Sequence, residues 1–264
     1  MPPGTPGSPA IPGIEVEWRD AVAVVRMRHG KVNAIGPAFL AELGRALDAC
    51  AAARALVLTA DGPTFSAGLD LPLLVDLDRE AMRGFMRAFS DGMLRLFELP
   101  APVIAAVNGH AIAGGCVLAL QADVRLAADG PGLMGLNETQ LGLGLPAVVL
   151  HPLLLAIPPA SFAPVALEGT LVPPRRALEL GLVHEVVPPA ELLPRALERA
   201  ARLAALPPAG VRRVKELARR GVSHRIREDG AAELDRWVDD WFAPETRERV
   251  RGAVARLGKG RPQA

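Results

Sequence analysis

Short, almost uninterrupted apolar runs alternate with amphipathic helical segments in the first half of this chain, and this alternation most constrains its fold. Residues 21–27, 55–59 and 103–107 are nearly all apolar, which is typical of strands buried on both faces of a sheet. A helix is predicted to begin at Pro37, and another over 79–97 carries Met and Phe residues at helical spacing. We therefore expect an α/β fold with a parallel sheet and covering helices.

The second half of the chain is predicted to be mostly helical from about residue 147 onward, with loops at four Pro-Pro pairs. A last long helix over 231–257, interrupted at Pro244, carries a wide apolar stripe. The stripe consists of Leu234, Trp237, Val238, Trp241 and Phe242. A stripe this aromatic must be buried on its own domain or on a neighbouring subunit.

Composition limits the possible functions. The net charge of the 264-residue chain is +1, with acidic and basic residues interspersed, so no global field points to nucleic acid or a membrane surface. Tyr is absent, which argues against stacking platforms for single-stranded nucleic acid. The first 13 residues are read as a disordered lead-in rather than a targeting peptide, and no apolar run is long enough to span a membrane. We expect a soluble cytoplasmic protein in which Cys50 and Cys116 are reduced thiols of the core.

Three segments combine small residues with groups that can do chemistry. Residues 65–71 (FSAGLDL) contain a small-small-Gly turn, where a backbone can approach a ligand closely. Residues 107–116 (VNGHAIAGGC) follow a buried strand and open a helix, whose free N–H groups favour developing negative charge. Residues 135–142 (GLNETQLG) place Glu138 among apolar and small residues, where lost solvation should raise its pKa toward neutrality.

Each segment alone also has a plain structural explanation, as an ordinary turn or as a surface Glu that caps one. A nucleotide phosphate loop is disfavoured because the GxGxxG and GxxxxGK[ST] patterns are missing. Nucleophilic catalysis is disfavoured too, because no base can be assigned to Ser66 and no Ser/His/Asp or Cys/His arrangement is legible.

Taken together, the order, spacing and text of the three segments resemble the enoyl-CoA hydratase/isomerase (crotonase) superfamily over roughly residues 14–258. The resemblance implies a ββα spiral core over 14–200 and a helical region over 201–264 that builds a homotrimer or a dimer of trimers. It also implies an acyl-CoA substrate, with no nucleic acid or membrane partner. FSAGLDL and GLNETQLG look most like the Δ3,Δ2-enoyl-CoA isomerases of the superfamily.

The family's roles carry over to single positions of this chain. Its oxyanion hole implies backbone N–H donors at Leu69 and Gly114, each worth roughly 3–4 kcal/mol toward an enolate-like transition state. Hydratases of the family use two glutamates, and the corresponding positions here are Val117 and Glu138. Valine can neither orient nor deprotonate water, so the resemblance implies a double-bond shift with Glu138 as the single base and acid. No metal or redox cofactor is implied, because CoA arrives as part of the substrate.

The resemblance also suggests how CoA is held. It places the adenine against the backbone of Ser66, Ala67 and Gly68. Lys31 is a candidate phosphate contact, although a solvated surface lysine fits it equally well, and Lys259 is a second candidate. The acyl chain would lie against helix 79–97 and residues 141–145, but the Met and Phe residues of that helix are more often simply core.

Other polar residues are expected to be structural. Asp70 belongs to the CoA-binding turn that the resemblance implies, and it should order this turn by accepting backbone N–H groups. Asp76 or Asp78 either begins a helix or supplies other chemistry. His110 and His151 are read as packing residues. The remaining histidines show no partner pattern, and they are His29, His184 and His224.

Two alternatives stay open at this stage. Another crotonase-fold reaction on acyl-CoA, such as hydration, thioester hydrolysis or decarboxylation, would keep the same oxyanion hole. A non-catalytic acyl-CoA binder would keep only the fold. Glu138 argues against a non-catalytic binder, because an unpaired buried carboxylate destabilises the fold and is expected only where it has a function.

Overall fold

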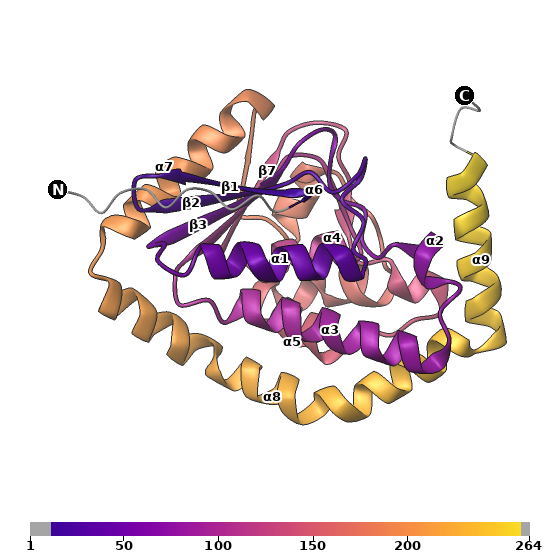
Figure 1. Ribbon diagram of the computed structural model, residues 1–264. Helices are drawn as coiled ribbons and strands as arrows, with labels where there is room; N and C mark the ends of the chain where they lie inside the picture. The colour runs from indigo at the N-terminus through magenta and orange to yellow at the C-terminus, as the bar shows by residue number, and fades with distance from the viewer. Residues whose placement is uncertain (1–11, 260–264) are drawn as a thin grey trace.

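The apolar runs form the centre of a six-stranded sheet in the computed structural model, which describes residues 12–259 (Figure 1). The strand order is β1-β2-β3-β5-β7-β9, where β1 and β2 are antiparallel and every other neighbouring pair is parallel. The strands are β1 Ile14–Arg19, β2 Val22–Met27, β3 Ala55–Ala60, β5 Val103–Val107, β7 Val124–Ala128 and β9 Glu185–Val187. Residues 1–11 of the lead-in predicted over residues 1–13 lie outside the described residues.

The central strands are apolar on both sides because both faces of the sheet are covered. In β2, Val22 and Val24 point into one hydrophobic cluster, while Ala23 and Val25 point into the other. This two-residue alternation lets one short strand serve two cores. The predicted parallel sheet is confirmed, and the observed strands differ from the predicted runs by a residue or so at their ends.

Helices on one face of the sheet form a thick layer, whereas the other face is covered mainly by α7 (Figure 1). The helices of the thick layer are α1 Pro37–Ala49, α3 Arg79–Phe97, α4 Gly114–Leu120 and α5 Ala147–Ala156. The opposite face holds α7 Leu192–Ala205, whose alanines Ala196 and Ala200 are fully buried against the strands. The Met and Phe residues of α3 are buried in the larger core.

The remaining short elements connect these layers. They are α2 Leu71–Leu74, the 3-10 helix η1 Glu138–Leu141, η2 Pro159–Ser161, the π-helical turn η3 Ala163–Leu167, α6 Pro174–Glu179 and η4 Pro189–Glu191.

The long helix near the C-terminus begins earlier than the aromatic stripe predicts. It is α8, Pro208–Phe242, and it passes beneath α3 and α5 before α9, Pro244–Lys259, turns away beside α2 (Figure 1). The break at Pro244 is confirmed, but the start near residue 231 is wrong. The first half of α8 is rich in arginine and has no continuous apolar stripe, so periodicity alone did not reveal it. The stripe is buried on its own domain: Trp237 and Trp241 stack with centroids 5.5 Å apart.

No helix within residues 12–259 combines the length and the apolar character that crossing a bilayer requires. Both cysteines are buried free thiols, as predicted.

A second, three-stranded parallel sheet has the order β4-β6-β8. Its strands are β4 Thr64–Ser66, β6 His110–Ile112 and β8 Met134–Gly135. Gly115, at the start of α4, packs directly on β4: a β-carbon at this position would lie 2.1 Å from the Ser66 carbonyl oxygen. Only glycine allows the helix to begin this close to the strand.

We predict that Gly115→Ala lowers the free energy of unfolding by about 1–3 kcal/mol or more, because the added methyl group overpacks two backbone segments. The matched control is Gly84→Ala, in α3, where an added β-carbon meets no neighbouring atom within 4 Å. That control should instead gain about 0.5–1 kcal/mol from helix propensity. Urea denaturation measures both, and a Gly115→Ala protein as stable as the wild type would contradict the packing described here.

Candidate active site

The small sheet brings the three chemically promising segments together. Its strands belong to the first, second and third segment respectively, and the central strand β6 pairs with both others. Because all three strands are parallel, the residues that follow them emerge at one edge. Leu69, Gly114 and Glu138 all lie within three residues of those strand ends. The structure therefore gathers all three predicted catalytic positions in one region.

The backbones at Leu69 and Gly114 lie side by side. A β-carbon on Gly114 would be 3.4 Å from the Leu69 nitrogen, and one on Gly68 would be 3.0 Å from the Gly114 nitrogen. Within residues 12–259, neither the Leu69 N–H nor the Gly114 N–H has an acceptor among the backbone bonds of turns and caps or the side-chain bonds. Two neighbouring amide donors without partners are available for a ligand oxygen.

Ala113, immediately before Gly114, has a strained backbone. Its φ of 49° and ψ of −118° fall in a region that favours glycine. The Ala113 methyl group also lies close to Gly68, because a β-carbon added to Gly68 would be only 3.1 Å from the Ala113 Cβ. The Ala113 N–H donates to the Gly135 carbonyl at 2.8 Å, which fixes the residue between the second and third segments. Strain that is held by its surroundings at such a place is typical of functional sites.

The turn of the first segment uses most of its polar groups internally. The Ser66 hydroxyl donates to the Asn33 carbonyl at 2.7 Å and accepts from the Gly68 N–H at 3.2 Å. Ser66 is fully buried, and the Ala67 N–H donates to the Val32 carbonyl. The Asp70 carboxylate accepts from the Leu73 N–H at 3.3 Å and caps α2, as predicted.

Glu138 begins η1 at the end of the small sheet, and its environment is unusual for a carboxyl group. Its Oε2 is buried and has no hydrogen-bond partner within the described residues. Burial raises the pKa of Glu138 to about 7, against the lowering effect of its own backbone N–H. A carboxyl group with this pKa takes up and releases protons at neutral pH, which is what a general base or acid requires.

Cys116 on α4 is a weakly polar neighbour of Glu138. Burial first, and then the Glu138 carboxylate, raise the pKa of the Cys116 thiol, so the two side chains lie near one another and the thiol stays protonated. Val117 is 1% exposed on the same short helix α4. Helix α4 contains no carboxyl group that could act together with Glu138.

Helices α8 and α9 support the third segment from the C-terminal side, which the sequence patterns did not reveal. The Trp237 Nε1–H donates to the Gly144 carbonyl at 3.2 Å, and the Thr246 hydroxyl donates to the Gly142 carbonyl at 3.3 Å. A cavity of about 490 Å³ separates η1 from α9. It is lined by Gln140, Leu141, Glu245, Glu248, Arg249, Gly252 and Arg256.

Comparison with known proteins identifies the family to which this chain belongs. Residues 17–258 match the family model described as enoyl-CoA hydratase/isomerase. The chain belongs to this family. It is 32% identical over 230 residues to the human enzyme named enoyl-CoA delta isomerase 1, mitochondrial, covering 85% of this chain and 76% of that protein. It is also 32% identical over 234 residues to crotonyl-CoA hydratase of Syntrophomonas wolfei, covering 86% and 88% respectively.

Solved structures give the same result for the fold. The crystal structure of human mitochondrial delta3-delta2-enoyl-CoA isomerase superimposes with a TM-score of 0.89 at 31% identity, covering 95% of this chain and all of that chain. The enoyl-CoA hydratase EchA3 from Mycobacterium ulcerans superimposes with a TM-score of 0.79 at 29% identity, covering 87% of this chain and 99% of that chain. The crotonase fold and its helical C-terminal region are therefore confirmed.

The other polar candidates in this enoyl-CoA hydratase/isomerase family member have structural partners. His110 Nδ1 accepts from the Leu133 N–H at 3.1 Å, and His151 lies 2.9 Å from Asp229. The Asp78 carboxylate caps α3 by accepting from the Ala81 N–H at 2.8 Å. These observations agree with the structural roles expected for all three residues.

The three histidines for which the sequence shows no partner pattern also have partners in the structure. His29 Nδ1 lies 2.7 Å from Glu42, and His224 Nε2 lies 3.1 Å from Glu228. His184 Nδ1 accepts from the Arg125 N–H at 3.0 Å. The first and third pairs join residues distant in the sequence, which a spacing pattern cannot show.

Two predicted contacts with CoA remain predictions. Lys31 is exposed in the loop after β2. The side chain of Lys259 lies outside the part of the chain that the structure describes.

We predict that Ala113→Gly leaves the free energy of unfolding unchanged or raises it by roughly 1 kcal/mol. Relief of about 1–3 kcal/mol of backbone strain outweighs the added freedom of glycine in the unfolded chain. Thermal and urea denaturation measure this change. A clear loss of stability would mean that the methyl contact with Gly68 matters more than the strain.

We further predict that the contribution of Glu138 to the stability of the folded protein falls between about pH 4.5 and 7. In this window the unfolded chain has released the Glu138 proton while the folded protein still holds it, so rising pH favours the unfolded state. Glu138→Gln removes the effect, and its free energy of unfolding relative to wild type should rise by roughly 3 kcal/mol across the window. Urea denaturation at several pH values tests this.

The control for the pH experiment is Glu80→Gln, an exposed glutamate in the first turn of α3. Its difference from the wild type should stay nearly constant across the same window. A constant difference for Glu138→Gln as well would refute the burial of this carboxyl group.

Proposed function

We propose that this protein isomerises 3-enoyl-CoA to 2-enoyl-CoA with Glu138 as the only acid and base. The observation that carries the proposal is a buried Glu138 carboxyl oxygen without a partner, in a group with a pKa of about 7, on the same small sheet whose strand ends carry the neighbouring, unpartnered amides of Leu69 and Gly114. One proton-transfer group and one oxyanion-binding pair are sufficient for a double-bond shift. Hydration needs a further group that orients water.

The reaction follows from these groups. Ionised Glu138 takes a proton from C2 of the substrate, and the electron pair spreads over a dienolate whose negative charge lies largely on the thioester oxygen. The N–H groups of Leu69 and Gly114 stabilise that oxygen, at roughly 3–4 kcal/mol for each donor. Protonated Glu138 then returns the proton at C4, the electrons shift to a C2–C3 double bond, and the carboxylate is regenerated.

The surroundings of Glu138 favour isomerisation over hydration. Val117 cannot bind or activate water, and its position on α4 is the one that a second glutamate occupies in hydratases according to the resemblance. The site is proposed to keep water from the dienolate, and the burial of the Glu138 Oε2 supports this. The similarity to the human isomerase supports the same choice, whereas the similarity to the hydratase of Syntrophomonas wolfei supports only acyl-CoA chemistry in general.

Further parts of the proposal concern ligands and assembly. CoA enters as part of the substrate, so the reaction as proposed uses no metal or redox cofactor. The turn of Ser66, Ala67 and Gly68 and the exposed Lys31 are proposed to hold the CoA moiety. A homotrimer is proposed as well, supported by exposed Leu154 and Leu155 on α5, which are 50% and 53% accessible in the single chain. The cytoplasmic location stays a prediction.

The test is conversion of 3-enoyl-CoA to 2-enoyl-CoA over several chain lengths by wild type and Glu138→Gln. We expect wild-type turnover, and a fall in kcat of about 10²–10⁴-fold in the variant. The control is Glu168→Gln, which makes the same chemical change at an exposed glutamate just before the glycine that packs against η1. Its kcat should match the wild type.

Product analysis separates the competing reactions. Accumulation of 3-hydroxyacyl-CoA from 2-enoyl-CoA would identify a hydratase, and free CoA detected with a thiol reagent would identify a thioester hydrolase. An active Glu138→Gln variant would remove this residue from the mechanism. Binding of acyl-CoA without turnover would support the alternative of a non-catalytic acyl-CoA-binding protein.

A further inference from the structure

A groove outside the candidate active site lies at the opposite edge of the main sheet. Its walls include residues 51–54, which lead into β3, and residues 99–102, which lead into β5. The candidate catalytic groups instead follow β4, β6 and β8 of the small sheet, and β4 and β6 come after the carboxyl ends of β3 and β5. The groove is therefore separate from the site described above, and its occupation does not depend on the proposed reaction.

The groove consists of two adjoining cavities of about 460 and 550 Å³, which share Leu99, Pro100 and Arg212 as common walls. Each alone is within the size range of small-molecule sites. Most residues that line the larger cavity are apolar, among them Leu47, Cys50, Ala53, Leu203, Leu206 and Val211, and its basic residues are Arg54, Arg95 and Arg212. One of these, Leu206, is 47% exposed. We call this part the apolar compartment.

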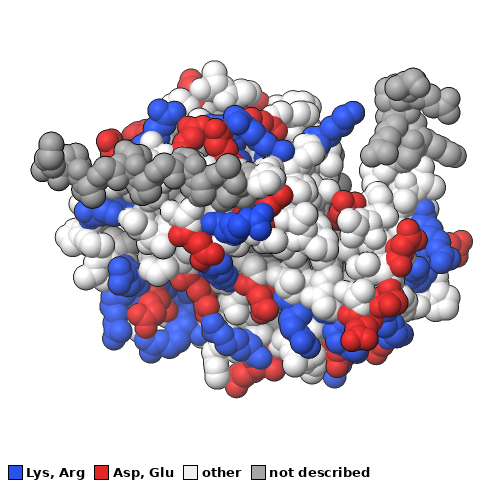
Figure 2. Space-filling view, viewed as in Figure 1, with Lys and Arg blue, Asp and Glu red and all other residues white. Residues whose placement is uncertain are grey.

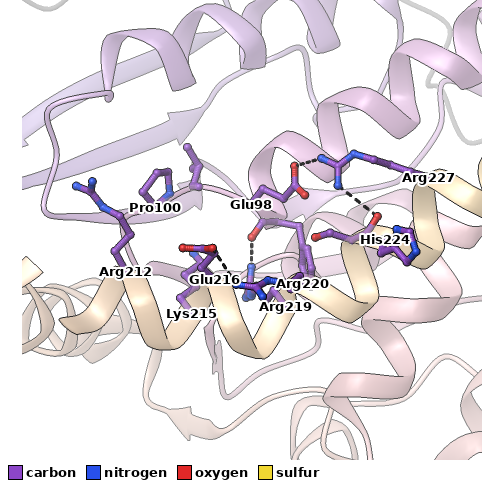
Figure 3. Close-up of a pocket in the computed structure, with 12 residues that line it drawn as sticks. Glu98, Pro100, Arg212, Lys215, Glu216, Arg219, Arg220, His224 and Arg227 are labelled. Carbon is purple, nitrogen blue, oxygen red and sulfur yellow. Dashed lines mark hydrogen bonds and ion pairs between the residues drawn. The ribbon is translucent and has the colours of Figure 1, made fainter. Parts of the chain in front are cut away.

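The smaller cavity, the basic compartment, lies between the first half of α8 and the segment after α3 (Figure 3). Its cations are Arg212, Lys215, Arg219, Arg220 and Arg227, and the acidic residues in its lining are Glu98 and Glu216. Figure 2 shows Lys and Arg side chains gathered over this part of the surface, with a few acidic side chains among them. Cations therefore outnumber carboxylates in this compartment.

The ion pairs among these residues do not neutralise all of the cations. A single carboxylate, Asp123, accepts from both Lys215 at 2.6 Å and Arg219 at 2.8 Å, and the side chains of these two cations are only 9% and 10% exposed. Burial lowers the pKa of Lys215 to about 8, although Asp123 opposes the change. Lys215 also donates to the Ala101 carbonyl, and Arg219 to the carbonyls of Phe97 and Gln121. The pair therefore keeps its hydrogen bonds but carries a net positive charge, which an anion at the groove surface would offset.

The remaining cations differ in how firmly they are held. Arg227 pairs with Glu98 at 2.6 Å, and Arg220 pairs with Glu216 at 3.2 Å in an exposed contact within α8. Arg212 has no hydrogen-bond or ion-pair partner within residues 12–259. Exposed pairs exchange partners readily, so Arg212 and Arg220 can both turn to a ligand.

We propose that this groove binds an anionic single-chain amphiphile, whose carboxylate or phosphate lies among Arg212, Arg220 and the Lys215–Arg219 pair and whose chain crosses Leu99 and Pro100 into the apolar compartment. The continuity of a basic and an apolar cavity matches the two ends of such a molecule. A purely polar anion would leave the apolar compartment unused, and a neutral lipid would leave the cations unpaired.

The test is isothermal titration of the full-length protein with dodecanoate and dodecyl phosphate below their micelle concentrations. Arg212→Ala should weaken binding by about tenfold or more, because it removes a charged hydrogen-bond donor. Glu216→Gln should tighten binding, because Arg220 is released from its carboxylate partner. The matched control is Arg225→Ala, which removes the same charge from an exposed position of α8 that lines neither cavity.

Two further probes each carry only one end of the amphiphile. Inorganic phosphate and octyl glucoside should each bind at least about tenfold more weakly than dodecyl phosphate, because each lacks one of the two complementary ends. Thermal melting verifies that each variant is folded. Equal affinity of Arg212→Ala and Arg225→Ala for dodecanoate would overturn the proposal. Binding to phosphatidylglycerol vesicles without binding of the monomeric amphiphiles would overturn it as well, in favour of a membrane surface.

Discussion

Backbone pairing among three very short strands is the interaction on which the candidate site depends. β4, β6 and β8 contribute few hydrogen bonds, yet they place the turns of three distant segments at one sheet edge. Gly115 makes this possible by letting α4 begin almost in contact with the Ser66 carbonyl. The two amides proposed as donors are therefore set by main-chain geometry, which side-chain substitution at Leu69 leaves unchanged.

The electrostatics of the site follow from that arrangement. The carboxyl group at the start of η1 is withdrawn from water, and its Oε2 receives no partner, so its neutral form is favoured at a pH where most glutamates are ionised. The folded protein tolerates this cost because the rest of the large core is apolar and continuous. Strain at Ala113 is a second, smaller cost at the same place. Both costs are concentrated where chemistry is proposed.

The helical C-terminal region contributes to this site as well as to the fold. Trp237 and Thr246 bond to carbonyls of the loop that follows Glu138, so α8 and α9 stabilise the third segment from outside. The first half of α8 is tied to the core at the opposite sheet edge by Lys215 and Arg219 on Asp123. One helix thus connects the surroundings of Glu138 with the basic compartment, which lies beyond the far ends of the strands.

Local pattern was sufficient for much of the fold. The buried strands, the helix over 79–97 and the break at Pro244 were predicted because their periodicity and proline chemistry act within a few residues. The start of α8 and the strand β9 were missed for the opposite reason. The arginine-rich half of α8 is held by packing and ion pairs, and β9 is a three-residue strand that exists only because β7 lies beside it.

The sequence by itself determined the identity of the three chemical segments, the apolar setting of Glu138 and the lack of a second acid at Val117, because these depend on residue type and order. Only the tertiary structure decided that the amides at Leu69 and Gly114 are neighbours, that Ala113 is held in its strained conformation by Gly135, and that His29 and His184 have partners. It also decided that α8 and the segment after α3 enclose a basic groove. Each of these requires residues far apart in the chain to meet, and contacts of that kind arise only when the sheets and helices pack together.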